Sequence, residues 1–146
     1  MKVVAIVQAR MGSTRLPGKV LKFINGKPMI EILLSRLSRS IELDQIVVST
    51  SLKTENDILN STIISLGYAC VRGSENDVLA RYYETAKKVK ADIVVRITAD
   101  CPLVDPQLVD ECIKGFKNSD IDYFSNTVPR SFPDGLDVSV MSFESI

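Results

Sequence analysis

Short apolar segments alternate along this chain with longer segments whose apolar residues recur at helical spacing. Strands are predicted at Val3–Val7, Gln45–Thr50, Tyr68–Val71, Asp92–Ile97, Ile121–Phe124 and Leu136–Val140. Helices are predicted over Met29–Leu37, from Thr54–Asp57 to Gly67, from Ser74–Asp77 to about Lys90, and from Asp105–Pro106 to near Gly115. Strands that are apolar at successive positions are typical of sheets buried on both faces. The pattern therefore predicts an α/β fold with a doubly wound, mostly parallel sheet.

Length and composition fit one ordinary domain, and we expect a single domain over residues 1–146. Apolar residues make up 45% of the chain and charged residues 25%, with a formal net charge of +0. These values exclude disordered, collagen-like and coiled-coil chains. No segment approaches the roughly 20 apolar residues of a membrane span, and the apolar run at the N-terminus is too short for a signal peptide. We therefore expect no membrane partner, and the zero net charge argues against nucleic acid.

The chain contains three cysteines and no histidine. The odd number and wide spacing of Cys70, Cys101 and Cys112 argue against a disulfide framework and favour a cytoplasmic protein. Without histidine, the usual Ser-His and Cys-His nucleophile pairs and imidazole zinc sites are excluded. Catalysis would then rest on lysine, arginine, carboxylates, backbone amides and a hard metal ion.

The loop after the first strand is basic and contains glycines. It begins Gln8-Ala-Arg-Met-Gly-Ser-Thr-Arg-Leu-Pro-Gly-Lys19, and ligands of such sheets bind beyond the carboxyl ends of the strands. Residues 1–30 hold no acidic side chain but six basic ones: Lys2, Arg10, Arg15, Lys19, Lys22 and Lys27. Glycines let backbone N–H groups approach a ligand, and arginine and lysine neutralise phosphate charge. We interpret the loop as a triphosphate site; the alternative is a solvated surface loop.

Two familiar phosphate-binding motifs do not describe this loop. The dinucleotide motif GxGxxG is absent. The segment from Gly12 to Gly18 encloses five residues where the P-loop encloses four, and Val20 stands where the P-loop has Ser or Thr. An ordinary P-loop nucleoside triphosphatase is therefore excluded.

Four motifs in order resemble the sugar-acid cytidylyltransferases, and most of all their spore coat polysaccharide biosynthesis protein F branch. The family includes the synthetases of CMP-activated Kdo and neuraminic acid. The motifs are the Gln8–Lys19 loop with Gly26-Lys-Pro-Met-Ile30, Arg72-Gly-Ser-Glu-Asn-Asp-Val-Leu-Ala-Arg-Tyr-Tyr83, Arg96-Ile-Thr-Ala-Asp-Cys-Pro-Leu-Val-Asp-Pro106 and Pro133-Asp-Gly-Leu-Asp-Val138. The resemblance covers residues 3 to 143. It implies the Rossmann-like nucleotide-diphospho-sugar transferase fold.

The resemblance also implies roles for individual residues. Nucleotide binding falls to Ala9, Arg10, Met11, Gly12, Ser13, Arg15 and Lys19, with Arg72, Gly73 and Ser74 near the base or ribose. Asp100 matches the aspartate that binds Mg²⁺, and together with Arg10 and Lys19 it forms the expected catalytic set. For Ser74 a helix-capping role remains equally open, and for Asp100 the alternative is a turn aspartate.

The remaining candidates are weaker. Asp134 and Asp137 are expected on the sugar side of the pocket, although Ser139 stands where the branch usually has an acidic residue. Asp120 and Asp122 form a D-x-D sequence that we interpret as a solvated turn. Cys101 lacks a histidine partner and is interpreted as a structural thiol.

The resemblance implies transfer of CMP from CTP to a sugar acid or related sugar, with release of pyrophosphate, for surface or spore coat polysaccharide. The family has a further C-terminal segment with a second metal-binding aspartate and dimer contacts, so we expect a C-terminally truncated chain whose full-length form is a homodimer. Two alternatives stay open: a glycosyltransferase that uses a nucleotide sugar, and a non-catalytic nucleotide-binding domain.

Overall fold

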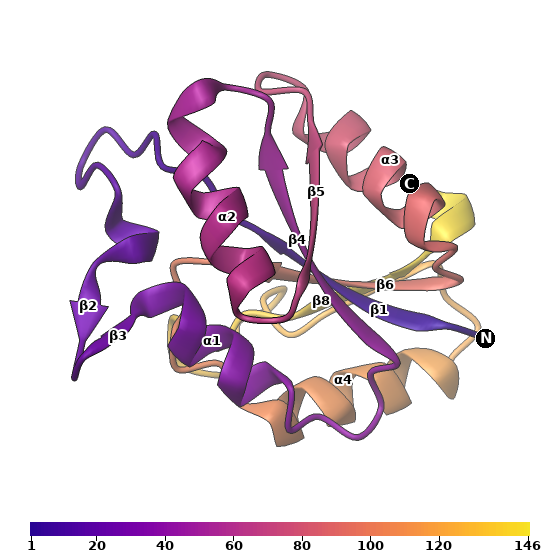
Figure 1. Ribbon diagram of the computed structural model, residues 1–146. Helices are drawn as coiled ribbons and strands as arrows, with labels where there is room; N and C mark the ends of the chain where they lie inside the picture. Colours follow the sequence, from indigo (N-terminus) through magenta and orange to yellow (C-terminus); the bar gives the residue numbers. More distant parts are fainter.

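Four parallel strands form the centre of the structure, a computed structural model that describes residues 1–146. They are arranged in the order β5-β4-β1-β6, with bounds β5(Ala69–Gly73), β4(Gln45–Ser51), β1(Val3–Gln8) and β6(Ile93–Thr98) (Figure 1). In the parallel register, Ile6 of β1 lies beside Val47 of β4 and Arg96 of β6. The carboxyl ends of β1 and β6 therefore meet at the same edge of the sheet. The predicted mostly parallel sheet is confirmed.

The last two strands extend this sheet in the opposite direction. They are β7(Tyr123–Ser125) and β8(Ser139–Ser142), and β8 pairs antiparallel with both β6 and β7. Both strands begin later than the segments predicted for them. The residues before β8, from Thr127 to Asp137, instead form an irregular loop beside the sheet.

Helices cover both faces of the sheet, but unequally (Figure 1). One face packs against α1(Met29–Leu37), α2(Asp57–Ser65) and α4(Pro106–Lys117), in a core of 24 buried apolar residues. The other packs against α3(Val78–Val89), in a core of eight. The smaller core leaves part of the α3 face available to polar side chains near the carboxyl ends of the strands.

Several local predictions needed correction. Thr54 does not cap a helix: Thr54–Asn56 forms a 3₁₀ turn, and α2 starts at Asp57 without a side-chain cap. Asp77, rather than Ser74, caps α3, because its carboxylate accepts the N–H of Ala80.

The end of α4 and the long first loop also differ from expectation. Helix α4 passes through Gly115 to Lys117, while its predicted start, capped by Asp105, is confirmed. Within the loop, the structure adds a 3₁₀ turn at Lys19–Leu21 and a hairpin of β2(Phe23–Ile24) and β3(Lys27–Pro28). This hairpin projects from the body of the sheet (Figure 1).

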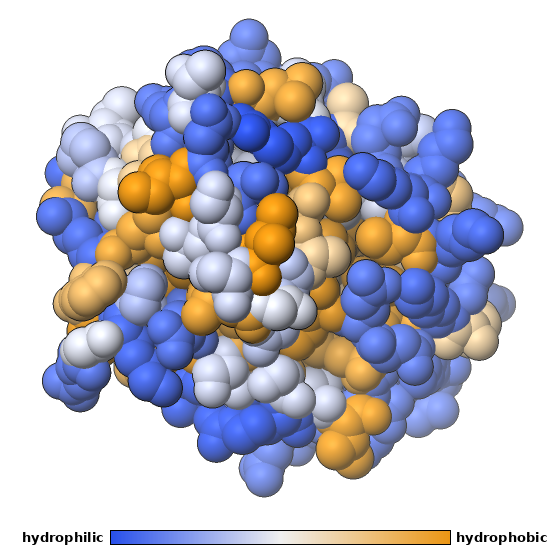
Figure 2. Space-filling view, in the orientation of Figure 1, coloured by the Kyte–Doolittle hydropathy of each residue, from blue (hydrophilic) through white to orange (hydrophobic).

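The face seen in Figure 2 carries apolar residues interspersed with hydrophilic ones. None of the helices has both the length and the apolar character needed to cross a membrane. All three cysteines are free.

Candidate functional site

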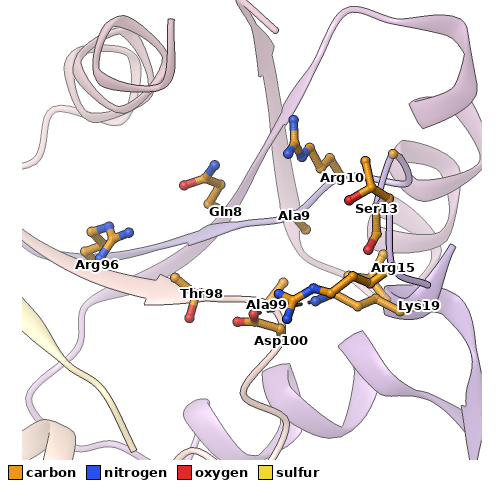
Figure 3. Close-up of a pocket in the computed structure, with 13 residues that line it drawn as sticks. Gln8, Ala9, Arg10, Ser13, Arg15, Lys19, Arg96, Thr98, Ala99 and Asp100 are labelled. Atoms are coloured by element: carbon orange, nitrogen blue, oxygen red, sulfur yellow. Dashed lines mark ion pairs between the residues drawn. The ribbon is translucent and has the colours of Figure 1, made fainter. Parts of the chain in front are cut away.

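A pocket of about 320 Å³ opens at the carboxyl ends of β1 and β6, where the strand order predicted a ligand site. Figure 3 shows side chains from the first loop on one side and from β6 on the other. Its lining consists of Gln8, Ala9, Arg10, Gly12, Ser13, Thr14, Arg15, Lys19, Val20, Arg96, Thr98, Ala99 and Asp100. The structure therefore brings together all the predicted loop residues except Met11 and places them in one pocket with the predicted Asp100, which follows β6.

Met11 holds the loop closed from outside the pocket. Its carbonyl oxygen accepts the N–H groups of Ser13 and Gly18, each at 2.9 Å. Gly18 adopts a φ of +68°, a left-handed conformation in which glycine carries no steric cost. Residues 12–17 thus form a loop whose neck, formed by Met11 and Gly18, is closed by a hydrogen bond.

Asn56 anchors this neck to the body of the protein. Its side-chain oxygen accepts the N–H of Met11 at 2.8 Å, and its side-chain nitrogen donates to the hydroxyl oxygen of Ser51 at 2.7 Å. Asn56 is fully buried. Sequence reasoning missed this residue because it belongs to a different motif, between β4 and α2.

Lys19 and Asp100 face each other across the pocket. The Lys19 Nζ lies 3.5 Å from Asp100 Oδ2, and Arg15 approaches the same region (Figure 3). Partial burial acts to raise the pKa of Asp100, but the Thr98 hydroxyl and the Lys19 charge outweigh it, so the pKa is lowered. Asp100 is therefore an ionised carboxylate at neutral pH, half exposed to the pocket.

Arg10 turns toward an acidic partner at the rim. Its Nη1 lies 3.4 Å from Glu75 Oε1, and Lys53 Nζ lies 3.5 Å from the same oxygen. The Ser51 hydroxyl, then the charges of Lys53 and Arg10, lower the pKa of Glu75 despite its partial burial. Glu75 thus holds two cations beside the pocket.

The structure does not bring the Arg72–Ser74 segment into the pocket. Arg72 donates to the carbonyl oxygens of Ser51 at 3.0 Å and Lys53 at 2.9 Å, and pairs with Asp57 at 2.7 Å. Ser74 accepts the N–H of Asp77 at 3.1 Å. These contacts tie β5 to its neighbours, while Gly73 packs against Arg81.

A second pocket, of about 240 Å³, adjoins the first and shares Arg96 and Thr98 with it. Its other lining residues are Tyr123, Thr127, Arg130, Asp137 and Ser139. Asp137 makes a two-pronged pair with Arg130, at 2.6 and 3.3 Å. Asp134 also pairs with Arg130, at 3.4 Å, but its side chain is 91% exposed and outside the pocket.

Sequence reasoning missed Arg96, Thr98 and Arg130 as pocket residues. Arg96 and Thr98 alternate with apolar residues in β6, a pattern that could have indicated one polar strand face.

Cys101, Asp120 and Asp122 have no expected role in the site, and none of them lines either pocket. Cys101 Sγ lies 3.4 Å from the Thr98 hydroxyl, and partial burial raises the pKa of its thiol, which keeps it protonated at neutral pH. Asp120 and Asp122 are exposed. Nowhere in the structure do three or more potential metal-ligating side chains form a cluster.

The sequence of this chain is similar to those of known proteins. The profile of a family described as "Cytidylyltransferase" matches residues 4–132. The spore coat polysaccharide biosynthesis protein SpsF of Bacillus subtilis is 40% identical over 125 residues, which are 83% of this chain and 52% of that protein. This chain spans about half the length of the curated relatives it matches.

Two solved structures also resemble this chain. A cytidylyltransferase from Leptospira borgpetersenii superposes with a TM-score of 0.94 at 35% identity, covering 99% of this chain and 62% of that one. The CMP:2-keto-3-deoxy-manno-octonic acid synthetase complexed with CTP gives a TM-score of 0.81 at 20% identity, covering 99% and 75%. At that identity the second likeness shows the shared fold.

Proposed function

The chain belongs to the cytidylyltransferase family, and from that premise we propose that it is the nucleotide-binding domain of an enzyme that transfers CMP from CTP to a sugar acid or related sugar. The product would serve surface or spore coat polysaccharide. The observation that carries the proposal is the cationic loop with its glycines, which faces the Asp100 carboxylate across a pocket at the carboxyl ends of β1 and β6.

The loop residues have the chemistry to hold a triphosphate. The backbone N–H of Gly12 makes no hydrogen bond within the protein and can donate to a phosphate, and Arg10, Arg15 and Lys19 supply positive charge. In the proposed reaction the acceptor hydroxyl oxygen bonds to the α-phosphorus in line. The bond from that phosphorus to the α,β-bridging oxygen breaks, pyrophosphate leaves, and the hydroxyl proton passes to solvent. The cations stabilise the charge that grows on pyrophosphate, while the pocket aligns the two substrates.

Asp100 fits a divalent cation shared with the nucleotide. Mg²⁺ commonly takes one or two protein carboxylates and completes its shell with phosphate oxygens and water, so one ionised, half-exposed carboxylate is a suitable donor. When bound there, Mg²⁺ would withdraw charge from the phosphate oxygens. The pair with Lys19 shows that this carboxylate already attracts a cation.

The acceptor has its own candidate space in the second pocket. Asp137 lines that pocket, as expected for a residue on the sugar side, whereas Asp134 lies at its exposed rim. For Arg72, Gly73 and Ser74, contact with the base or ribose stays a prediction. So does the homodimer of the longer protein.

Thermal stabilisation of this chain by CTP, UTP, ATP and GTP, each with Mg²⁺, tests the proposal. A ligand at about 100 times its Kd adds about 2.7 kcal/mol of stability. We expect selective stabilisation by CTP that Lys19→Ala abolishes and Lys22→Ala retains, since Lys22 is exposed and outside the pocket.

Equal shifts with nucleoside diphosphates and nucleotide sugars would favour the glycosyltransferase alternative. In the full-length protein, Asp100→Asn should reduce pyrophosphate release by well over tenfold with little change in melting temperature. Turnover at the wild-type rate in that variant would refute the metal assignment, and CTP binding without turnover in the full-length protein would leave the non-catalytic alternative.

A further inference from the structure

Arg96 is a charged residue in the middle of the sheet, yet it is exposed. It lies in β6 between β1 and β8, in register with Ile6 and Ser139. Register partners share a face, so Arg96 is on the face that α3 covers. Because α3 covers only part of this face, Arg96 lines both pockets.

No carboxylate neutralises Arg96. It takes part in none of the ion pairs of the structure. Its neighbour on α3 is the buried Tyr82. Burial raises the pKa of Tyr82 to about 12, and the nearby Arg96 charge acts in the opposite direction. The guanidinium therefore faces a neutral hydroxyl rather than a counter-ion.

The other cation of the second pocket is already paired. Arg130 is held by both oxygens of Asp137 and by Asp134. This pairing leaves Arg96 as the uncompensated positive charge of the second pocket. A neutral occupant would leave the charge without a partner, whereas an anionic group would receive a charge-assisted hydrogen bond.

The rest of the second pocket suits a hydroxylated molecule. The Tyr123 hydroxyl donates to Ser139 Oγ at 3.0 Å, and Ser139 Oγ lies 3.4 Å from Ser125 Oγ. Ser125 in turn lies 2.7 Å from the hydroxyl of Thr127. Hydroxyl groups can both donate and accept, so those of Tyr123, Thr127 and Ser139, which line the pocket, can bind the hydroxyls of a sugar in several orientations.

The position of Arg96 separates it from the phosphate-facing cations. Figure 3 shows Arg96 at one end of the first pocket and Lys19, Arg15 and Asp100 at the other, with Gln8 and Thr98 between. Arg96 therefore lies where the two pockets meet rather than within the cationic loop.

From this geometry we propose that Arg96 binds the carboxylate of the acceptor sugar and thereby selects acidic sugars over neutral ones. The inference rests on the proposed function, because it takes the second pocket as the acceptor site. It adds a specificity-determining residue outside the aspartates expected on the sugar side.

A comparison of acids with their esters tests the assignment. The probes are 2-keto-3-deoxy-manno-octonate, N-acetylneuraminate and the methyl ester of each, which keeps the hydroxyls but removes the charge. Binding is measured by NMR titration of this chain, with and without the non-cleavable analogue α,β-methylene-CTP. We expect at least one acid to bind at least about tenfold more tightly than its ester, the low end of the range for charge-assisted hydrogen bonds.

Two variants locate the effect. Arg96→Met should bring the acid down to the affinity of its ester, and Arg96→Lys should retain part of the preference because it keeps the charge but not the planar fork. Arg39→Met removes the same charge from an exposed loop far along the chain from either pocket and should retain the full preference. Melting temperatures confirm that each variant folds.

Three results would overturn the inference. The first is that neither acid binds more tightly than its ester, and the second is that Arg96→Met leaves the acid preference intact. The third is that Arg96→Met abolishes binding of the CTP analogue, which would place Arg96 in the nucleotide site. The first two results leave the proposed function standing if the CTP analogue still binds. If the CTP analogue does not bind the unmodified chain, the proposed function is refuted instead.

Discussion

Replacing Asn56 with alanine should destabilise the protein and loosen a loop that Asn56 does not itself line. The side chain is fully buried and joins the neck of the first loop, at Met11, to Ser51 at the end of β4. Alanine removes both hydrogen bonds and supplies no alternative partner. The N–H of Met11 is then left without a hydrogen-bond partner in the protein, and its partial burial limits its access to bulk water.

The magnitude follows from these two contacts. An N–H left unpaired costs about 1–3 kcal/mol, and a lost hydrogen bond whose partner can rebond costs about 0.5–1.5 kcal/mol. Ser51 can rebond, because its hydroxyl oxygen also lies 3.4 Å from the N–H of Lys53. We therefore expect Asn56→Ala to lower the free energy of unfolding by about 2–4 kcal/mol, which for a chain of this length is about 6–12 °C in melting temperature.

Urea unfolding and calorimetry would measure the loss, with Asn118→Ala as the control. Asn118 is also an asparagine, but it is exposed at the end of α4 and its side chain makes no hydrogen bond. The CTP-dependent stabilisation should fall in Asn56→Ala as well, because the loop loses its anchor. An Asn56→Ala protein that unfolds and binds CTP like Asn118→Ala would refute the anchoring role.

Three further changes probe separate local interactions. Asp77→Ala should cost about 1 kcal/mol in urea unfolding, because its carboxylate caps α3 at the N–H of Ala80; a variant as stable as the wild type would contradict the assignment. Gly18→Ala should cost about 1–2 kcal/mol, because its φ of +68° is unfavourable for alanine, and a neutral result would mean that the loop relaxes. Glu75→Gln should destabilise the protein at pH 7 by an amount that shrinks as the pH falls below 4.5, the ordinary pKa of this carboxyl. The sign follows because a lowered pKa in the folded state stabilises the protein above the unfolded-state pKa and ceases to do so as the carboxylate protonates; a loss independent of pH would show that the Glu75 charge is not the cause.

The buried strands were predictable because their signal is intrinsic to the residues. Runs such as Val3–Val7 are apolar at successive positions, and only a sheet covered on both faces buries such a run. The end of α4 was not predictable in this way. Gly115 lies inside the helix because a Cβ there would come within 3.1 Å of the Phe124 ring, so the glycine serves close packing with β7 rather than termination.

Capping residues show a second limit. The segments at Thr54 and Ser74 both fit the same spacing, yet the first forms a 3₁₀ turn and the second contains the cap at its last position, Asp77. Spacing identifies a helix start within a few residues. Which side chain accepts the free N–H group depends on backbone geometry that the spacing does not contain.

The sequence predicts those residues of the candidate site that come directly after one strand. The loop after β1 and Asp100 after β6 were expected at one edge, and these strands are neighbours. Arg72 was expected there too, but β5 is at the edge of the sheet, with β4 between it and β1. The order of strands in a sheet depends on long-range pairing, so a motif at the end of a strand has no fixed distance from the site.

The pair of Lys19 and Asp100 links phosphate and cation binding. Both side chains are partly exposed, and such ion pairs contribute only about 0–1 kcal/mol, so they separate readily. A phosphate that draws Lys19 away leaves the Asp100 carboxylate, whose pKa is lowered, ionised and without its counter-charge. A divalent cation arriving with the phosphate restores that balance, and by linkage each ligand then raises the affinity for the other equally. The pocket is therefore better suited to a nucleotide and a cation together than to either alone.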